Sequence, residues 1–159
     1  MQTQPIETID SSRMQVLSDF RYADEPINRI EQYYLGILGN KFMTRMRDLD
    51  GNERAKVFFE RANYDEVVAT MENIFADNLV LQQVDDFTIK QGLDNLIIGM
   101  TTTFPQTASA PVISFHLTNN RRAILDELNL GGWDLYMSIE TGKKMLDEMK
   151  RIREQVTNA

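Results

Sequence analysis

The chain has 159 residues and a formal net charge of −7, with 42% hydrophobic and 26% charged residues, values typical of one globular domain. It contains no cysteine, which excludes disulfides and thiolate chemistry. No apolar run approaches the roughly 20 residues that cross a bilayer, and the polar first residues lack a signal-peptide pattern. We therefore expect a cytoplasmic protein. The acidic balance argues against general nucleic-acid binding, which depends on neutralising phosphates with Lys and Arg.

The first forty residues predict a loose arm followed by two helices. Residues 1–12 are polar and include a proline, so we expect a flexible N-terminal arm, with a single domain over 13–159. The apolar residues of the 14–22 segment fit a strand or a helix, and we favour the helix. The 24–38 segment opens with two acidic residues and a proline and continues with helical apolar spacing, so a second helix is predicted there.

The next part of the chain predicts a hairpin and a helix. Two β-rich runs within 42–60 flank a turn at 48–53 that is rich in Asp, Asn and Gly, which indicates a β-hairpin. A helix over 54–62 is the alternative. Asn63 and Glu66 have the spacing of a helix-capping box, and the apolar residues after them predict a helix.

The region after that helix predicts two strands, over 79–89 and 96–104, with a turn around Gly92 between them. A loop bracketed by two prolines follows, over 104–111.

The C-terminal third predicts two successive strand–helix units. A strand over 112–117 precedes a helix over 121–128, and a strand over 133–137 precedes a helix capped by Ser138. The last helix carries one apolar stripe, which needs an apolar surface to cover it: the protein's own sheet or another subunit. The order of elements predicts an α+β fold, a single domain with a mostly antiparallel sheet, helices packed on one face, and two strand–helix units at its end.

No catalytic, metal-binding or cofactor-binding motif in the sequence has the residue spacing that its chemistry requires. The glycine of the 48–53 turn is in the wrong register for a calcium loop. Gly142-Lys143-Lys144 lacks the earlier glycine and the hydroxyl residue of a phosphate-binding loop. His116 is the single histidine, and no cysteine is present to complete a transition-metal site. We expect no metal and no cofactor. A hydrolase that uses His116 as general base with an acidic partner is kept as an alternative.

Two basic pairs indicate a site for a small anion. Each pair lies near the start of a predicted helix, where positive charge opposes the helix dipole, and a bound phosphate or carboxylate would relieve that conflict. Two asparagines before the first pair add hydrogen-bond donors. The candidate ligand-binding residues are Asn119, Asn120, Arg121, Arg122, Lys143 and Lys144.

Methionine and tyrosine side chains supply a candidate protein interface. The alternative for the same side chains is the core. The candidate interface residues are Tyr33, Tyr34, Met43, Met46, Met145, Met149 and Ile152.

These observations predict a non-enzymatic intracellular binding or adaptor protein, a homodimer that acts by protein–protein contact. Acidic chaperones and inhibitors, including virus-encoded ones, are analogous in class. A protein that binds a small anion or nucleotide through the basic pairs is the first alternative, and the His116 hydrolase is the second.

Overall fold

The computed structural model describes residues 7–24, 29–76, 87–89, 95–103, 112–120, 124–126 and 133–158. These residues form two four-stranded antiparallel sheets, one short parallel pair of strands and three α-helices. The first sheet has the order β2-β3-β4-β5, with β2 (Gln15–Asp24), β3 (Arg29–Leu38), β4 (Lys41–Arg47) and β5 (Glu53–Glu60). The second has the order β10-β8-β7-β6, with β6 (Phe87–Ile89), β7 (Asn95–Thr103), β8 (Val112–Asn120) and β10 (Asp134–Ser138).

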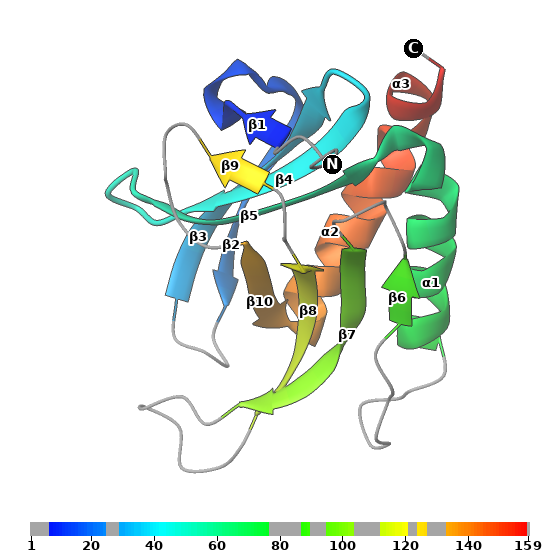
Figure 1. The fold of residues 1–159 in the computed structure, drawn as a ribbon. Coiled ribbons are helices and arrows are strands. Elements are labelled where there is room, and N and C mark those ends of the chain that lie inside the picture. Colours follow the sequence, from blue (N-terminus) through cyan, green and yellow to red (C-terminus); the bar gives the residue numbers. More distant parts are fainter. Residues whose placement is uncertain are drawn as a thin grey trace, which may run out of the picture.

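The remaining elements are a short pair of strands, three α-helices and two 3-10 turns. The parallel pair consists of β1 (Glu7–Ile9) and β9 (Ile124–Asp126). The helices are α1 (Tyr64–Ala76), α2 (Ile139–Arg151) and α3 (Arg153–Thr157), and two 3-10 turns occupy Ser11–Arg13 and Arg61–Asn63. Figure 1 shows α1 and α2 side by side along one side of the sheets, with α3 directly after α2. The prediction of a mostly antiparallel α+β fold with helices on one face is confirmed.

One large apolar core lies between the helices and the inner faces of both sheets. Side chains alternate between the two faces of a strand, so Phe42 and Phe59 point into this core while Met43 and Phe58 point to the opposite face of the first sheet. The apolar stripe of the last helix is buried in the same core, so the protein's own sheets cover it; its members are Met145, Met149, Ile152 and Val156.

The two N-terminal helices are wrong predictions. The 14–22 segment lies in β2, and the described part of the 24–38 segment forms β3, which pairs antiparallel with β2. Phe20, Tyr33 and Leu35 point into the core with the period of two that a strand requires. The apolar spacing that predicted a helix is overridden by pairing of β3 with β4. The sheet provides hydrogen-bond partners for the backbone N–H and C=O groups of a segment that tertiary contacts bury.

The helix predicted over 121–128 is also wrong where it can be checked. Ile124–Asp126 form β9 and pair in parallel with Glu7–Ile9, and the rest of that segment lies outside the described residues. The pairing partner is more than a hundred residues away, so local sequence carries no trace of it. The same pairing places part of the predicted flexible arm in a strand, while residues 1–6 lie outside the description.

Most other elements predicted in the described ranges lie close to their predicted places. The hairpin is β4–β5, so the alternative helix over 54–62 is wrong, and α1, β7, β8 and β10 lie close to their predicted places. The hairpin turn is organised by Asp48, whose Oδ1 accepts hydrogen bonds from the backbone of Asp50 and Asn52. Ser138 caps α2 as predicted, since its Oγ accepts a hydrogen bond from the Thr141 backbone at 3.2 Å. Of the strand predicted over 79–89, only Phe87–Ile89 is described, as β6; the turn around Gly92 and the 104–111 loop lie outside the description.

Candidate functional site

The predicted anion-binding residues are only partly described. Arg121 and Arg122 lie outside the described residues, and Asn120 is placed by its backbone alone, at the end of β8. Lys143 is exposed on α2. The Nζ of Lys144 lies 3.2 Å from the Glu148 carboxylate, so its charge already has a partner on the same helix.

The start of α2 is closed by the protein itself. The Ser138 hydroxyl oxygen accepts a hydrogen bond from the Thr141 N–H. Lys143 and Lys144 lie after the first turn of α2 rather than in it. An anion at this helix start would compete with the cap for that N–H group.

Asn119 joins the two sheets. Its side-chain oxygen accepts a hydrogen bond from the Phe58 N–H at 2.9 Å, and its Nδ2 donates to the Phe58 C=O at 2.8 Å. The Asn119 backbone N–H donates to the Trp133 carbonyl at 2.9 Å. The side chain is 5% exposed and pairs with β5 as a neighbouring strand would. Sequence analysis placed Asn119 in an anion site, and the structure places it at the seam between the sheets.

Most of the predicted interface residues are buried in the interior of this chain. Tyr33 is fully buried, and its hydroxyl donates to the Glu31 carboxylate at 2.8 Å. Tyr34 is half-buried on the second face of the first sheet. The five others are buried in one of the two apolar clusters: Met43, Met46, Met145, Met149 and Ile152. Their burial in one subunit explains the pattern without a second copy.

His116 lies on β8 opposite Tyr136 of β10, with ring centroids 5.6 Å apart. It is 7% exposed, so a substrate has little access to its ring in this conformation. On its other side, His116 is paired with Gly99 of β7.

Sequence analysis missed a row of cations on the second face of the first sheet. Lys41, Arg45 and Lys56 are at most 8% exposed there. Lys41 lies over the ring of Phe58 and Lys56 over the ring of Trp133, each 5.1 Å from the ring centroid.

A buried carboxylate neutralises part of this row. Both oxygens of Glu53 accept hydrogen bonds from Arg45, at 2.8 and 3.0 Å, and Arg47 reaches the same carboxylate at 3.2 Å. Such bidentate pairs have the geometry that makes an ion pair strong. Alternation of basic residues along 41–47 is the signal that could have shown that these cations share one face. Because these cations are buried against Glu53, Glu60 and aromatic rings of the same chain, they do not present an accessible site.

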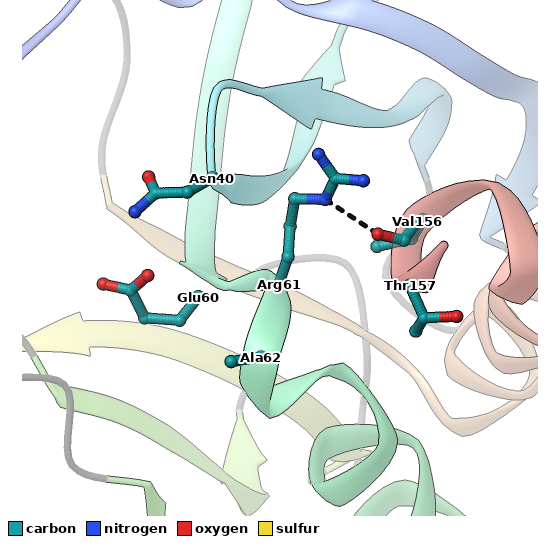
Figure 2. Close-up of a pocket in the computed structure, with 6 residues that line it drawn as sticks. All are labelled: Asn40, Glu60, Arg61, Ala62, Val156 and Thr157. Atoms are coloured by element: carbon teal, nitrogen blue, oxygen red, sulfur yellow. Dashed lines mark hydrogen bonds between the residues drawn. The ribbon is translucent and has the colours of Figure 1, made fainter. Parts of the chain in front are cut away.

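A hollow of about 300 Å³ lies where the β3–β4 turn, the end of β5 and the end of α3 meet. Figure 2 shows the Arg61 side chain extending between Asn40 and Val156. The Arg61 Nε donates to the Val156 carbonyl at 2.7 Å, and Nη1 donates to the Gly39 carbonyl at 3.2 Å. Arg61 therefore ties the C-terminal helix to the first sheet; the hollow is lined by Asn40, Glu60, Arg61, Ala62, Val156 and Thr157.

The hollow does not favour a ligand of either charge. The Nη2 atom of Arg61 is buried and has no acceptor among the described residues, but protein atoms cover it. The Glu60 carboxylate, which is 3.2 Å from the Lys41 Nζ, and the carbonyls at the end of α3 would repel an anion. A cation would meet the Arg61 guanidinium. We interpret this hollow as a structural joint, meaning the place where Arg61 connects α3 to the first sheet.

Arg61→Ala should lower the free energy of unfolding by about 2 kcal/mol, because two carbonyl groups lose a charged donor. Urea unfolding measures the change. Ala62→Ser, at the exposed neighbouring position, is the matched control and should shift stability by less than about 0.5 kcal/mol. Equal stability of Arg61→Ala and the control would rule out the joint.

Two surface ion-pair groups fix the helices. Both Asp65 oxygens of α1 accept hydrogen bonds from Arg153 of α3, and that guanidinium holds the pKa of Asp65 below its usual value. The Glu148 carboxylate accepts a hydrogen bond from Arg151, the largest cause of its lowered pKa. The hydroxyl of Ser18 also donates to Glu148, at 3.1 Å, which connects α2 to β2.

The outer edge of β2 is a sheet edge that no described strand covers. Among the described residues, β2 pairs with β3 on one side and with no strand on the other, along ten residues. The other edge of this sheet, β5, is held by Asn119. On β2, Val16 is 47% exposed, and Asp19 and Arg21 are also exposed. A strand edge of this length presents unpaired N–H and C=O groups that can pair with another chain.

Comparison with known proteins gives no further guide to the site. No protein-family model matches the chain, and no curated protein matches it with significance. The described residues contain no helix that is both long and apolar enough to cross a membrane. They also contain no cluster of three or more His, Asp and Glu side chains placed to hold a metal ion.

Proposed function

We propose that the chain is a non-enzymatic binding protein that acts by protein–protein contact, through the outer edge of β2. The observation that carries this proposal is the ten-residue edge strand without a neighbouring strand in the described part of the chain. Pairing with an added strand is a common mode of protein recognition, in which main-chain hydrogen bonds provide the affinity.

Two of the devices that protect strand edges are missing from β2, while a bulge and charged side chains are present. Natural proteins protect strand edges with lysine, proline or a covering element. Residues 15–24 contain neither lysine nor proline. A bulge lies between Val16 and Ser18, near the start of the strand, and regular pairing with β3 continues after it to Asp24. The regular part is long enough to accept a partner strand.

Val16→Asp should abolish the contact, because a charged residue with low strand propensity then replaces an exposed apolar one on the edge. The protein is isolated from the cells that naturally make it and analysed by native mass spectrometry. We expect the 18.4-kDa wild-type chain to carry a second protein chain, of its own or another mass, and the Val16→Asp chain to have lost it.

Leu49→Asp is the matched control. Leu49 is 57% exposed in the β4–β5 turn, so this variant makes the same kind of substitution at an exposed apolar residue away from β2. It should keep the second chain. A wild-type protein found only as a monomer, or a Val16→Asp protein that keeps the second chain, would contradict the proposal.

A further inference from the structure

We infer that the strand that occupies the β2 edge is β2 of a second copy, paired antiparallel with Phe20 opposite Phe20. This inference rests on the contact proposed above and names its occupant. A two-fold axis through Phe20 would join the two first sheets into one continuous eight-stranded sheet, since each contributes four strands. Such a contact uses the same surface on both copies, as most homodimers do.

Charge complementarity along β2 selects this register. In an antiparallel pair, the residue numbers of two directly opposed positions always have the same sum. When Phe20 lies opposite Phe20, Asp19 of each copy therefore lies directly opposite Arg21 of the other. Asp19 and Arg21 are exposed on the same face of the strand. The dimer therefore gains two symmetric cross-strand ion pairs, and opposite charges in directly opposed positions stabilise an antiparallel pair.

The neighbouring registers are unfavourable. A pair centred on Asp19 puts two carboxylates opposite each other, and one centred on Arg21 opposes two guanidinium groups. A pair centred on Ser18 would put the bulge between Val16 and Ser18 beside the two-fold axis, whereas a pair centred on Phe20 keeps the bulge near the ends of the paired segment. Side chains alternate between the two faces of a strand. The core-facing sides of the two sheets therefore lie on the same side of the joined sheet only when the residue numbers of opposed positions have an even sum.

The Phe20 register also agrees with the contacts on the helix side. Phe20 is 8% exposed, stacks on Tyr33 with ring centroids 5.1 Å apart, and lies under Lys144. Its side chain is held by its own subunit, so pairing leaves it in place. Arg21 has a weak contact with Gln32 at 3.4 Å, which leaves its guanidinium available to a carboxylate across the interface.

A charge-swap series tests the register. Arg21→Asp creates two opposed carboxylate pairs and Asp19→Arg creates two opposed guanidinium pairs, so each single variant should weaken self-association by about 10- to 100-fold. The double variant Asp19→Arg/Arg21→Asp restores opposite charges and should return to within about three-fold of wild type. Sedimentation equilibrium at fixed ionic strength measures the dissociation constants, and circular dichroism checks that each variant is folded.

The two single variants control for net charge, because one makes the chain more acidic and the other less acidic. If net charge alone governed association, they would act in opposite directions. The inference is overturned if either single variant associates like wild type, or if the double variant stays as weak as the singles. A wild-type chain that is monomeric alone but holds a different protein in a Val16→Asp-sensitive complex would overturn self-pairing and leave the proposed contact standing.

Discussion

Asn119→Ala should be among the most damaging single substitutions, with a loss of about 3 to 5 kcal/mol in the free energy of unfolding. The Phe58 N–H and C=O point away from β4 and are both bound by the Asn119 side chain, at 2.9 and 2.8 Å. Alanine leaves both buried backbone groups without these bonds, and each unsatisfied group costs about 1–3 kcal/mol. The small cavity left by the amide adds to the loss. Urea unfolding followed by circular dichroism measures the effect.

Two further variants identify the cause. Asn119→Asp keeps an acceptor for the Phe58 N–H but puts a carboxylate oxygen against the Phe58 carbonyl, so it should also be destabilised at neutral pH. Thr118→Ala, at the half-buried neighbouring position on β8, should cost less than about 1 kcal/mol. An Asn119→Ala protein as stable as Thr118→Ala would show that the seam does not depend on this amide.

Gly36→Ala should destabilise the protein by about 3 kcal/mol or more. A Cβ atom at this position would lie 2.0 Å from the Gln15 carbonyl oxygen and 2.8 Å from the Gln15 carbonyl carbon. Both are backbone atoms of β2, so no side-chain rotation relieves the clash, and the start of β2 must move away from β3. The close approach belongs to the irregular pairing at the β2 bulge, where Val16 is opposite Gly36.

Gly39→Ala separates the loss of space from the loss of backbone freedom. A methyl group on Gly39 would have no atom within 4 Å of it, but φ is +62°, so alanine there should cost about 1 kcal/mol. Thermal unfolding of the two variants side by side provides the comparison. If Gly36→Ala costs no more than Gly39→Ala, the contact between Gly36 and the Gln15 backbone is not a packing constraint.

Local signals predicted the elements whose partners are close in sequence. The Asp-Gly turn and its flanking β-rich runs predicted the β4–β5 hairpin, and Ser138 with the apolar stripe of the last helix predicted α2. β3 was missed because its apolar residues fit helical spacing as well as strand spacing, and only its place between β2 and β4 decides the matter. β9 depends on β1, far away in the chain, which no local pattern reveals.

The candidate site was less predictable than the fold. Asn119 was noticed for its donors, but its role depends on β5 lying beside β8, a relation between sheets. Met145 and Met149 were assigned to an interface because an apolar stripe does not say what covers it, and the structure buries them in the chain's own core. The β2 edge could not be recognised until β2 was known to be a strand at the end of a sheet.

Hydrogen exchange of the β2 backbone in the assembled protein tests the central claim most directly. Wild-type protein in its assembly is compared with the Val16→Asp protein, with β3 and β4 as internal references. If another strand pairs with β2, amides within Gln15–Asp24 should exchange at least about ten-fold more slowly in the assembly, while the references stay unchanged. Equal exchange of β2 in the two proteins, with a second chain still bound to the wild type, would place the contact elsewhere and contradict the account.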